Sequence, residues 1–282
     1  MTFSLIVATI NRTEPLVNLL HSVGRTPEAR TGSVQVIVVD QNMDDRLASL
    51  LRPFGASLNL LHLRSAPGVS RARNAAFSAV GGQVVAFPDD DCLYRESTLT
   101  KVSSQLERQP DCAGLSGRVV GFDGRPYNLR WPQQAEPIDK RRVWMQALSV
   151  SLFLRREVVD RVGLFDESLG VGAGTLWGSG EETDYVLRAL NAGYLLRFDP
   201  AIEILHPAAK DRFDLAQRTR AYAYALGMGR VLRTHSFPLR DRLQFVLRPA
   251  LGSLFYAARF HFPGARYYAG VAKGRLQGVL SR

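Results

Sequence analysis

The stretch Val84-Val85-Ala86-Phe87-Pro88-Asp89-Asp90-Asp91 is a short apolar segment that ends in three adjacent carboxylates. Three other segments rich in Val, Ile, Leu and Phe precede it. Together the four segments predict strands over Phe3–Ala8, Val34–Val39, Leu58–Leu63 and Val84–Phe87. The helices predicted between and after these strands are Glu14–Val23, Asp44–Arg52, Val69–Ala79 and Glu96–Glu107. Near-continuous apolar strands that alternate with helices indicate an α/β fold whose parallel sheet is covered on both faces.

Polar residues follow three of these strands, and parallel sheets bind ligands at the carboxyl ends of their strands. The three polar strand ends are Thr9-Ile10-Asn11-Arg12, Asp40-Gln41-Asn42 and Asp89-Asp90-Asp91. We expect them to converge on one edge of the sheet. Adjacent carboxylates repel one another, and Mg²⁺ or Mn²⁺ relieves that repulsion because hard cations prefer carboxylate oxygens. The alternative for the acidic run is a solvated turn or a helix N-terminus.

The second half of the chain contains another acidic cluster. The pattern predicts a strand over Ala113–Gly121, a loop over residues 122–140, a strand over Leu148–Leu154, a helix over Arg156–Val162 and a glycine-rich loop over residues 167–180. That loop leads into a helix that begins near Glu181, within Gly178-Ser179-Gly180-Glu181-Glu182-Thr183-Asp184. The helix dipole favours ionised carboxylates there, and an ionised carboxylate can act as general base towards an acceptor hydroxyl. The alternative is an acid-rich helix start in which Asp184 pairs with Arg188.

The charge is concentrated in the last quarter of the chain. Residues 212–282 carry 13 Lys and Arg but only 2 Asp and Glu, whereas the rest of the chain has a net charge of −1. This distribution indicates a local basic patch and argues against a nucleic-acid-binding protein. We predict that the tail is helical. Its arginines, interleaved with Phe, Tyr and Leu, suit an anionic membrane surface, and the alternative is helices packed on the catalytic domain with solvated arginines.

Three further features narrow the class of protein. The two cysteines, Cys92 and Cys112, imply neither a disulfide framework nor a cysteine metal site, and a reduced compartment is expected. No apolar run reaches the ~18–20 residues of a transmembrane helix. Met1–Ser4 leads straight into an apolar segment without a basic region, so we expect no secretory signal.

Six segments taken together resemble the family 2 glycosyltransferases, inverting and metal-dependent enzymes with a GT-A fold. In chain order these segments are Ser4–Arg12, Val36–Asp40, Gly68–Ala76 (their Gly-x-x-x-Ala-Arg-Asn segment), Asp89–Asp91 (their Asp-x-Asp motif), Gly163–Glu167 (their Gly-x-Phe-Asp-Glu element) and Glu181–Asp184 (in place of their Glu-Asp-x-Asp). The resemblance covers residues 3–206 and not the tail. It implies a GT-A domain over residues 1–211, with a Rossmann-like, mostly parallel sheet, followed by a basic helical extension over residues 212–282.

The resemblance also implies roles for individual residues. The donor-binding residues are Thr9, Asn11, Asp40, Arg73, Asp89 and Asp90, with Arg71 as the alternative to Arg73. In this assignment Asp40 contacts the nucleotide base, and Asp89 or Asp90 contacts the ribose. The metal ligands are Asp91, Asp89 and His206, and a purely structural histidine is the alternative for His206.

The catalytic base is assigned to Glu182, at the position where the family usually has Asp, and Glu181 is the alternative. The acceptor-binding residues are Trp177, Gly180 and Asp184. The aromatic face of Trp177 can stack on a sugar of the acceptor, and a place in the hydrophobic core is the alternative for this side chain.

The sequence therefore predicts the transfer of one sugar, with inversion, from a nucleoside-diphosphate sugar to an acceptor hydroxyl. The implied donor is UDP-linked, the cofactor is Mn²⁺ or Mg²⁺, and the acceptor is a saccharide or a lipid-linked saccharide. The expected setting is cell-surface polysaccharide or glycolipid synthesis in the cytoplasm, peripheral to the inner face of the cytoplasmic membrane.

Two other classes of protein remain as alternatives. A nucleotidyltransferase usually has a glycine-rich basic loop after its first strand, which Thr9–Arg12 does not provide. A non-catalytic sugar-binding or nucleic-acid-binding protein would not need both acidic clusters.

Overall fold

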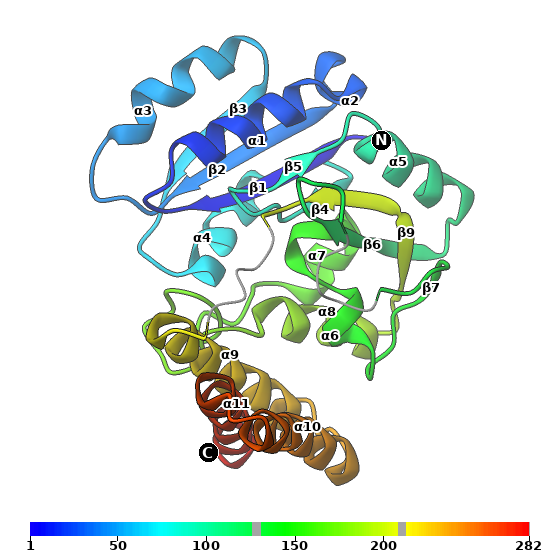
Figure 1. Cartoon of the computed structure of the whole chain (residues 1–282). Coiled ribbons are helices and arrows are strands. Elements are labelled where there is room, and N and C mark those ends of the chain that lie inside the picture. Colours follow the sequence, from blue (N-terminus) through cyan, green and yellow to red (C-terminus); the bar gives the residue numbers. More distant parts are fainter. Residues whose placement is uncertain (126–130, 208–212, 282) are drawn as a thin grey trace. The chain divides into compact units, whose positions relative to one another are not determined.

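The computed structural model describes residues 1–125, 131–207 and 213–281, and the chain divides into two compact units (Figure 1). The sheet unit comprises Met1–Pro67, Arg71–Phe165 and Tyr185–Ala209. The helical unit comprises Gly68–Ser70, Asp166–Asp184 and Lys210–Arg282. The helical unit thus includes the glycine-rich loop as well as the basic tail, and the predicted domain boundary after residue 211 stays a prediction.

The sheet unit is built on a mixed sheet that has nine strands in the described part of the chain. These are β1 (Phe3–Thr9), β2 (Val34–Asp40), β3 (Asn59–Arg64), β4 (Val84–Ala86), β5 (Leu93–Tyr94), β6 (Cys112–Val120), β7 (Glu136–Pro137), β8 (Leu152–Arg155) and β9 (Leu195–Leu205). Their order is β3-β2-β1-β4-β8-β6-β9-β5, and β7 pairs with β9. All neighbours from β3 to β4 are parallel, as predicted. The rest of the sheet is mixed because β8 runs antiparallel between β4 and β6.

Helices flank this sheet (Figure 1). They are α1 (Glu14–Gly24), α2 (Pro27–Arg30), α3 (Arg46–Leu51), α4 (Val69–Ala76), α5 (Thr98–Arg108), α6 (Val143–Gln146), α7 (Arg156–Val162) and α8 (Glu181–Asn191), with 3₁₀ turns at Arg52–Ala56, Phe77–Ala79 and Ser149–Ser151. The predicted strand over Leu148–Leu154 is wrong in its first half, which forms the last of these turns. Serine hydroxyls compete for nearby backbone groups, and the Ser151 hydroxyl lies 3.3 Å from the carbonyl of Leu148, three residues earlier, to which it donates.

The predicted loops hold little regular structure. Within residues 122–140 the structure has only the two-residue strand β7, and residues 126–130 lie outside the described part of the chain. Residues 167–180 contain no helix or strand. The central strands are buried on both sides, since Leu5, Ile6 and the run Val36–Val39 are almost fully inaccessible. Continuous burial is what a sheet covered on both faces requires.

The helical unit contains the three helices α9 (Leu215–Thr234), α10 (Leu239–Ala258) and α11 (Phe262–Leu280), as the tail pattern predicted. Helix α11 packs against both α9 and α10. Glycines let the α9 and α11 backbones touch, because a Cβ atom at Gly278 would lie 2.2 Å from the Leu226 carbonyl oxygen. A Cβ atom at Gly229 would lie 2.4 Å from the Arg275 carbonyl oxygen. Among the described residues, no helix is both long enough and apolar enough to cross a membrane.

This close approach predicts opposite effects for two glycines of the same helix. Gly278→Ala should lower the free energy of unfolding by about 1–3 kcal/mol, because the added methyl group meets backbone atoms that have little room to move. Gly270 has open space around its Cβ position. Gly270→Ala should therefore raise stability by about 0.5–1 kcal/mol, the usual gain of alanine over glycine inside a helix. Denaturant unfolding of both variants tests the α9–α11 packing, and a destabilised Gly270→Ala or an unaffected Gly278→Ala would contradict it.

Candidate active site

The three polar strand ends meet at one edge of the sheet, as predicted. Thr9 and Asp40 lie side by side at the ends of β1 and β2. The Thr9 hydroxyl donates to Asp90 Oδ2 at 2.7 Å. The Asn11 backbone N–H donates to the Asn42 side-chain oxygen at 2.8 Å. Asn11 has φ +56°, a left-handed conformation that asparagine tolerates better than most residues, and this turn ties the first strand end to the second.

Asp90 is buried at this edge of the sheet and bonds to residues at and after the end of the first strand. Its carboxylate is 6% exposed, and Arg12 Nη1 donates to its Oδ1 at 2.8 Å. Burial raises the pKa of Asp90, while the Thr9 hydrogen bond and the Arg12 charge oppose that shift. Arg12 also pairs with Asp91. Arg12 had no predicted site role, and this arginine connects the first strand end to the acidic run.

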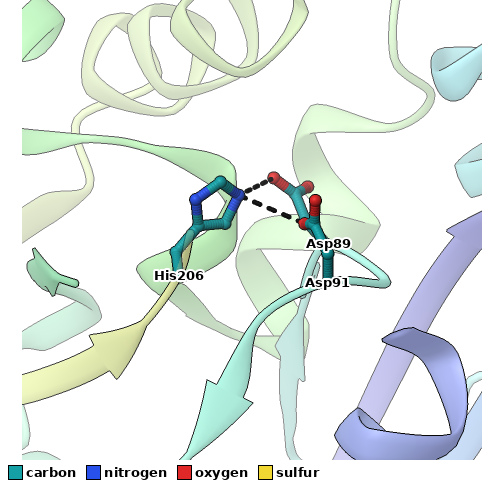
Figure 2. A group of neighbouring side chains, drawn as sticks. All are labelled: Asp89, Asp91 and His206. Atoms are coloured by element: carbon teal, nitrogen blue, oxygen red, sulfur yellow. Dashed lines mark ion pairs between the residues drawn. The ribbon is translucent and has the colours of Figure 1, made fainter. Parts of the chain in front are cut away.

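Figure 2 shows Asp89, Asp91 and His206 pointing toward one another. One ligand atom from each residue lies within 4.8 Å of the other two. His206 Nε2 is 3.2 Å from Asp91 Oδ1 and 3.7 Å from Asp89 Oδ2. Its Nδ1 atom is 2.9 Å from the Pro207 carbonyl oxygen. Since a carbonyl only accepts, Nδ1 carries a hydrogen, and Nε2 would have to lose its proton, and exchange its contacts with Asp89 and Asp91, to bind a cation.

The charges of this group suit a divalent cation. Burial alone would lower the pKa of His206, but hydrogen bonds and charges from Asp89 and Asp91 raise it to about 10. That shift shows how strongly the two carboxylates favour positive charge at the position of Nε2. Carboxylate oxygens suit Mn²⁺ and Mg²⁺, and an imidazole nitrogen can complete such a site. Asp89 and Asp91 are 41% and 18% exposed, so a cation between them can also reach a ligand from solution.

Arg73, on α4, lies next to this group. Its Nη2 atom is 3.8 Å from Asp89 Oδ1, and its guanidinium lies 5.3 Å from the Phe165 ring centroid. Asn74, its neighbour, exchanges two hydrogen bonds with the Phe165 backbone, at 3.0 and 2.8 Å. Arg71, the alternative, donates to a backbone carbonyl at 2.7 Å. The structure thus brings Arg73 to the acidic run and gives Asn74 a structural role.

Asp40 is completely buried, and both of its carboxylate oxygens have protein partners. Oδ1 accepts from the Asn42 backbone and side-chain nitrogens at 2.8 and 2.7 Å. Oδ2 lies 3.1 Å from His62 Nε2. His62 was not predicted from the sequence, because its position beside Asp40 depends on the β2–β3 register that pairs Val38 with His62. The contact of Asp40 with a nucleotide base stays a prediction.

The second acidic cluster opens α8 and belongs to the helical unit. Glu181 is only 7% exposed, and it packs against Gly170, where a Cβ atom would lie 3.0 Å from Glu181 Oε2. Gly170 has φ +100°, a backbone conformation that favours glycine. Glu182 is half-buried and therefore more accessible. Of the two candidate bases, Glu182 is the more accessible from solution.

Helix α9 holds the loop that carries these acids. The Gly178 backbone N–H donates to the Ala223 carbonyl at 3.1 Å. The Ser179 hydroxyl donates to the Tyr224 carbonyl at 2.8 Å. A Cβ atom at Gly227 would lie 2.1 Å from the Ser179 carbonyl oxygen. The backbone before Glu181 thus rests directly on α9, so the first helix of the tail supports the acidic cluster.

The three predicted acceptor-binding residues have partners in the same unit. Asp184 Oδ1 lies 2.8 Å from His235 Nε2, and both residues are at least nine-tenths buried. Gly180 has φ +99°, which favours glycine. Trp177 is half-buried, and the Arg230 guanidinium lies 5.6 Å from its ring centroid. The burial of Asp184 favours a positioning role for its carboxylate, while acceptor contacts for all three stay predictions.

Comparison with known proteins identifies the family. The sequence profile described as "Glycosyl transferase family 2" matches residues 4–163, more than half of the chain. The chain belongs to glycosyl transferase family 2. Glycosyltransferase AglE from Haloferax volcanii is 28% identical over 214 residues, which cover 73% of this chain and 66% of AglE. The succinoglycan biosynthesis protein ExoM from Rhizobium meliloti is 27% identical over 271 residues, covering 92% of this chain and 84% of ExoM.

Solved structures show that this family 2 glycosyltransferase has the predicted GT-A fold. Staphylococcus aureus TarS 1–349 in complex with UDP-GlcNAc aligns with a TM-score of 0.63 at 16% identity, covering 100% of this chain and 93% of that chain. The mannosyltransferase PcManGT from Pyrobaculum calidifontis, in complex with GDP-Man and Mn²⁺, also aligns at 0.63 and 16%, covering 97% and 86%. Family membership favours glycosyl transfer over a nucleotidyltransferase or a non-catalytic binding protein.

Proposed function

We propose that this glycosyltransferase moves one sugar, with inversion, from a nucleoside-diphosphate sugar to an acceptor hydroxyl. The observation that supports this most directly is the Asp89–Asp91–His206 group at the strand edge, whose donor atoms lie within 4.8 Å of one another. A divalent cation held by these residues would neutralise the donor diphosphate and the charge that develops on the leaving nucleoside diphosphate. We assign the cation as Mn²⁺ or Mg²⁺.

The protein's own residues supply binding, positioning and proton transfer. Thr9, Asn11, Asp40 and Arg73 form the proposed donor side, with the buried Asp90 keeping the strand ends together. Glu182 takes the proton of the acceptor hydroxyl. The acceptor oxygen then forms a bond to the anomeric carbon from the face opposite the diphosphate, and the bond from that carbon to the diphosphate oxygen breaks. The diphosphate leaves with the electron pair, so charge and atoms balance.

The proposed donor is a UDP-sugar, and the proposed acceptor is a saccharide or a lipid-linked saccharide. TarS in complex with UDP-GlcNAc supports uridine, whereas PcManGT in complex with GDP-Man makes guanosine the competing choice. ExoM is named for succinoglycan biosynthesis, which supports a role in polysaccharide assembly. We place this reaction in the cytoplasm, at the inner face of the cytoplasmic membrane. This setting keeps the enzyme close to a membrane-anchored acceptor.

The proposal is tested by thermal shift and donor hydrolysis with a panel of UDP-sugars and GDP-sugars, each with Mn²⁺ and with EDTA. A ligand that binds only the folded protein raises the unfolding temperature by mass action. We expect one donor to raise it in Mn²⁺ and not in EDTA. If no donor in the panel changed the unfolding temperature or was hydrolysed by a folded sample, the proposed donor site would be contradicted. Release of pyrophosphate from a nucleoside triphosphate and a sugar phosphate would establish a nucleotidyltransferase instead.

A further inference from the structure

An apolar stripe runs along the exposed face of α10. Leu243, Leu247, Leu251 and Leu254 are between 50% and 66% exposed, and Phe255 is 51% exposed. Residues four apart lie on the same face of a helix, so these side chains form one continuous stripe. Clustered exposed apolar residues of this size mark an interaction surface, whereas scattered single ones do not.

The opposite face of α10 is already packed. The Phe245 carbonyl accepts from Arg275 Nη1 at 2.7 Å, and the Ser253 hydroxyl donates to the Ala265 carbonyl at 2.9 Å. Pro249 is buried. These contacts fix α10 onto α11 through one side. The stripe is therefore the outward face of an ordered helix, with nothing in the described chain covering it.

Two phenylalanines extend the stripe through the turn that joins α10 to α11. Phe260 is 82% exposed and Phe262 is 56% exposed. Phe260 has φ +56°, an uncommon conformation for an aromatic residue. The turn therefore presents two large apolar side chains to solvent at the end of the leucine stripe.

The border of the stripe is cationic. Arg240, Arg248, Arg259 and Arg266 are all exposed, and the Arg259 guanidinium lies 4.1 Å from the Phe255 ring centroid. Residues 239–281 contain a single acidic residue. A second copy of this face would bring arginines against arginines, and like charges oppose such pairing. The surface of an anionic bilayer complements both features, because its acyl region matches the apolar stripe and its negative headgroups match the basic border.

We propose that this face of α10, continued by Phe260 and Phe262, binds the surface of an anionic lipid bilayer with the helix axis in the membrane plane. Apolar side chains would enter the acyl boundary while the arginines contact headgroups. The same compact unit carries Glu182 and Trp177. The unit that would hold the acceptor is thus the unit that would meet the lipid, which points to an acceptor on a lipid carrier. That last step rests on the proposed function.

The test is co-sedimentation of the full chain with phosphatidylcholine vesicles, with and without phosphatidylglycerol. We expect binding only to vesicles that contain phosphatidylglycerol, weakening as salt rises. Leu247→Glu/Leu251→Glu should weaken binding by about tenfold or more, since it removes two apolar side chains that would enter the bilayer and adds charges that anionic headgroups repel. The control Leu215→Glu changes a leucine on α9 that is 71% exposed and lies outside the stripe, and this variant should bind normally.

Failure to bind phosphatidylglycerol vesicles, or equal binding by the double variant, would overturn the proposal. A dimer in solution that the double variant converts to monomer, without vesicle binding, would also overturn it and assign the stripe to self-association. Donor-induced thermal shift in each variant reports folding and donor binding without vesicles. The experiments therefore test lipid binding and glycosyl transfer separately. Vesicle binding without any donor response would support the lipid-binding surface and contradict the proposed function.

Discussion

Glu182→Gln is expected to lower kcat for glycosyl transfer by about a thousandfold, within the range that a positioned general base contributes. The amide keeps the size and shape of the side chain but cannot accept the acceptor's proton. Donor binding should be unchanged, because the proposed donor residues lie on the strand edge. The measurement is kcat at saturating donor and acceptor, together with the donor dissociation constant from thermal shift. Glu107→Gln, an exposed position on α5, is the matched control.

The same experiment decides between the two adjacent glutamates. Glu181 is 7% exposed and packs against Gly170, whereas Glu182 is half-buried. Glu181→Gln should therefore reduce kcat much less than Glu182→Gln. If Glu181→Gln carries the thousandfold loss while Glu182→Gln is nearly normal, the base is Glu181. Normal turnover in both variants would end the assignment of a base to this helix start.

Local patterns predicted much of the fold. The strands β1, β2 and β4 follow from short apolar runs, because a strand buried on both faces needs apolar residues at nearly every position. Helix α7 lies at Arg156–Val162, as predicted, and Gly163 ends it with φ +78°. The antiparallel direction of β8 in the sheet was not predictable in the same way. Strand direction depends on contacts with β4 and β6, which short-range patterns do not encode.

The site residues also divide into those that local sequence patterns predicted and those that only tertiary contacts revealed. The acidic run and the acids of α8 were visible in the sequence because chemistry at a strand end or a helix start has a local signature. Arg12, His62 and His235 gained their partners through tertiary structure. His235 meets Asp184, which is 51 positions earlier in the chain. No spacing rule connects two such positions, so only the folded chain could pair them.

The packing of the C-terminal tail was only partly predictable from the sequence. The tail was predicted as a basic helical extension, and its first helix, α9, contacts the loop before Glu181 directly. Its sequence carried a signal, because a glycine inside a helix costs about 1 kcal/mol relative to alanine. Gly227 and Gly229 on α9, with Gly274 and Gly278 on α11, each leave no room for a Cβ atom. Helical glycines at such positions indicate close backbone packing of α9 against α11 and against the loop before Glu181.

Asp91→Asn is expected to weaken Mn²⁺ binding and to lower kcat by about a hundredfold to a thousandfold, since a catalytic cation stabilises transition-state charge by several kcal/mol. Asp91 Oδ1 lies 3.2 Å from His206 Nε2 and shares the proposed cation with Asp89. Asparagine keeps the shape and loses the charge. Mn²⁺ affinity is measured by calorimetry, and kcat is measured over a range of Mn²⁺ concentrations.

The Mn²⁺ titration separates a metal ligand from a solvated acidic turn. If Asp91 binds the cation, excess Mn²⁺ should restore part of the lost kcat of Asp91→Asn by refilling a weakened site. The exposed Asp111 is the matched control, and Asp111→Asn should keep normal kcat and Mn²⁺ affinity. If Asp91→Asn also behaves normally, the acidic run is a turn that Arg12 holds together without a cation, and the cation site must be sought elsewhere. A loss of kcat with unchanged Mn²⁺ affinity would instead mean that Asp91 acts on the donor without holding the cation.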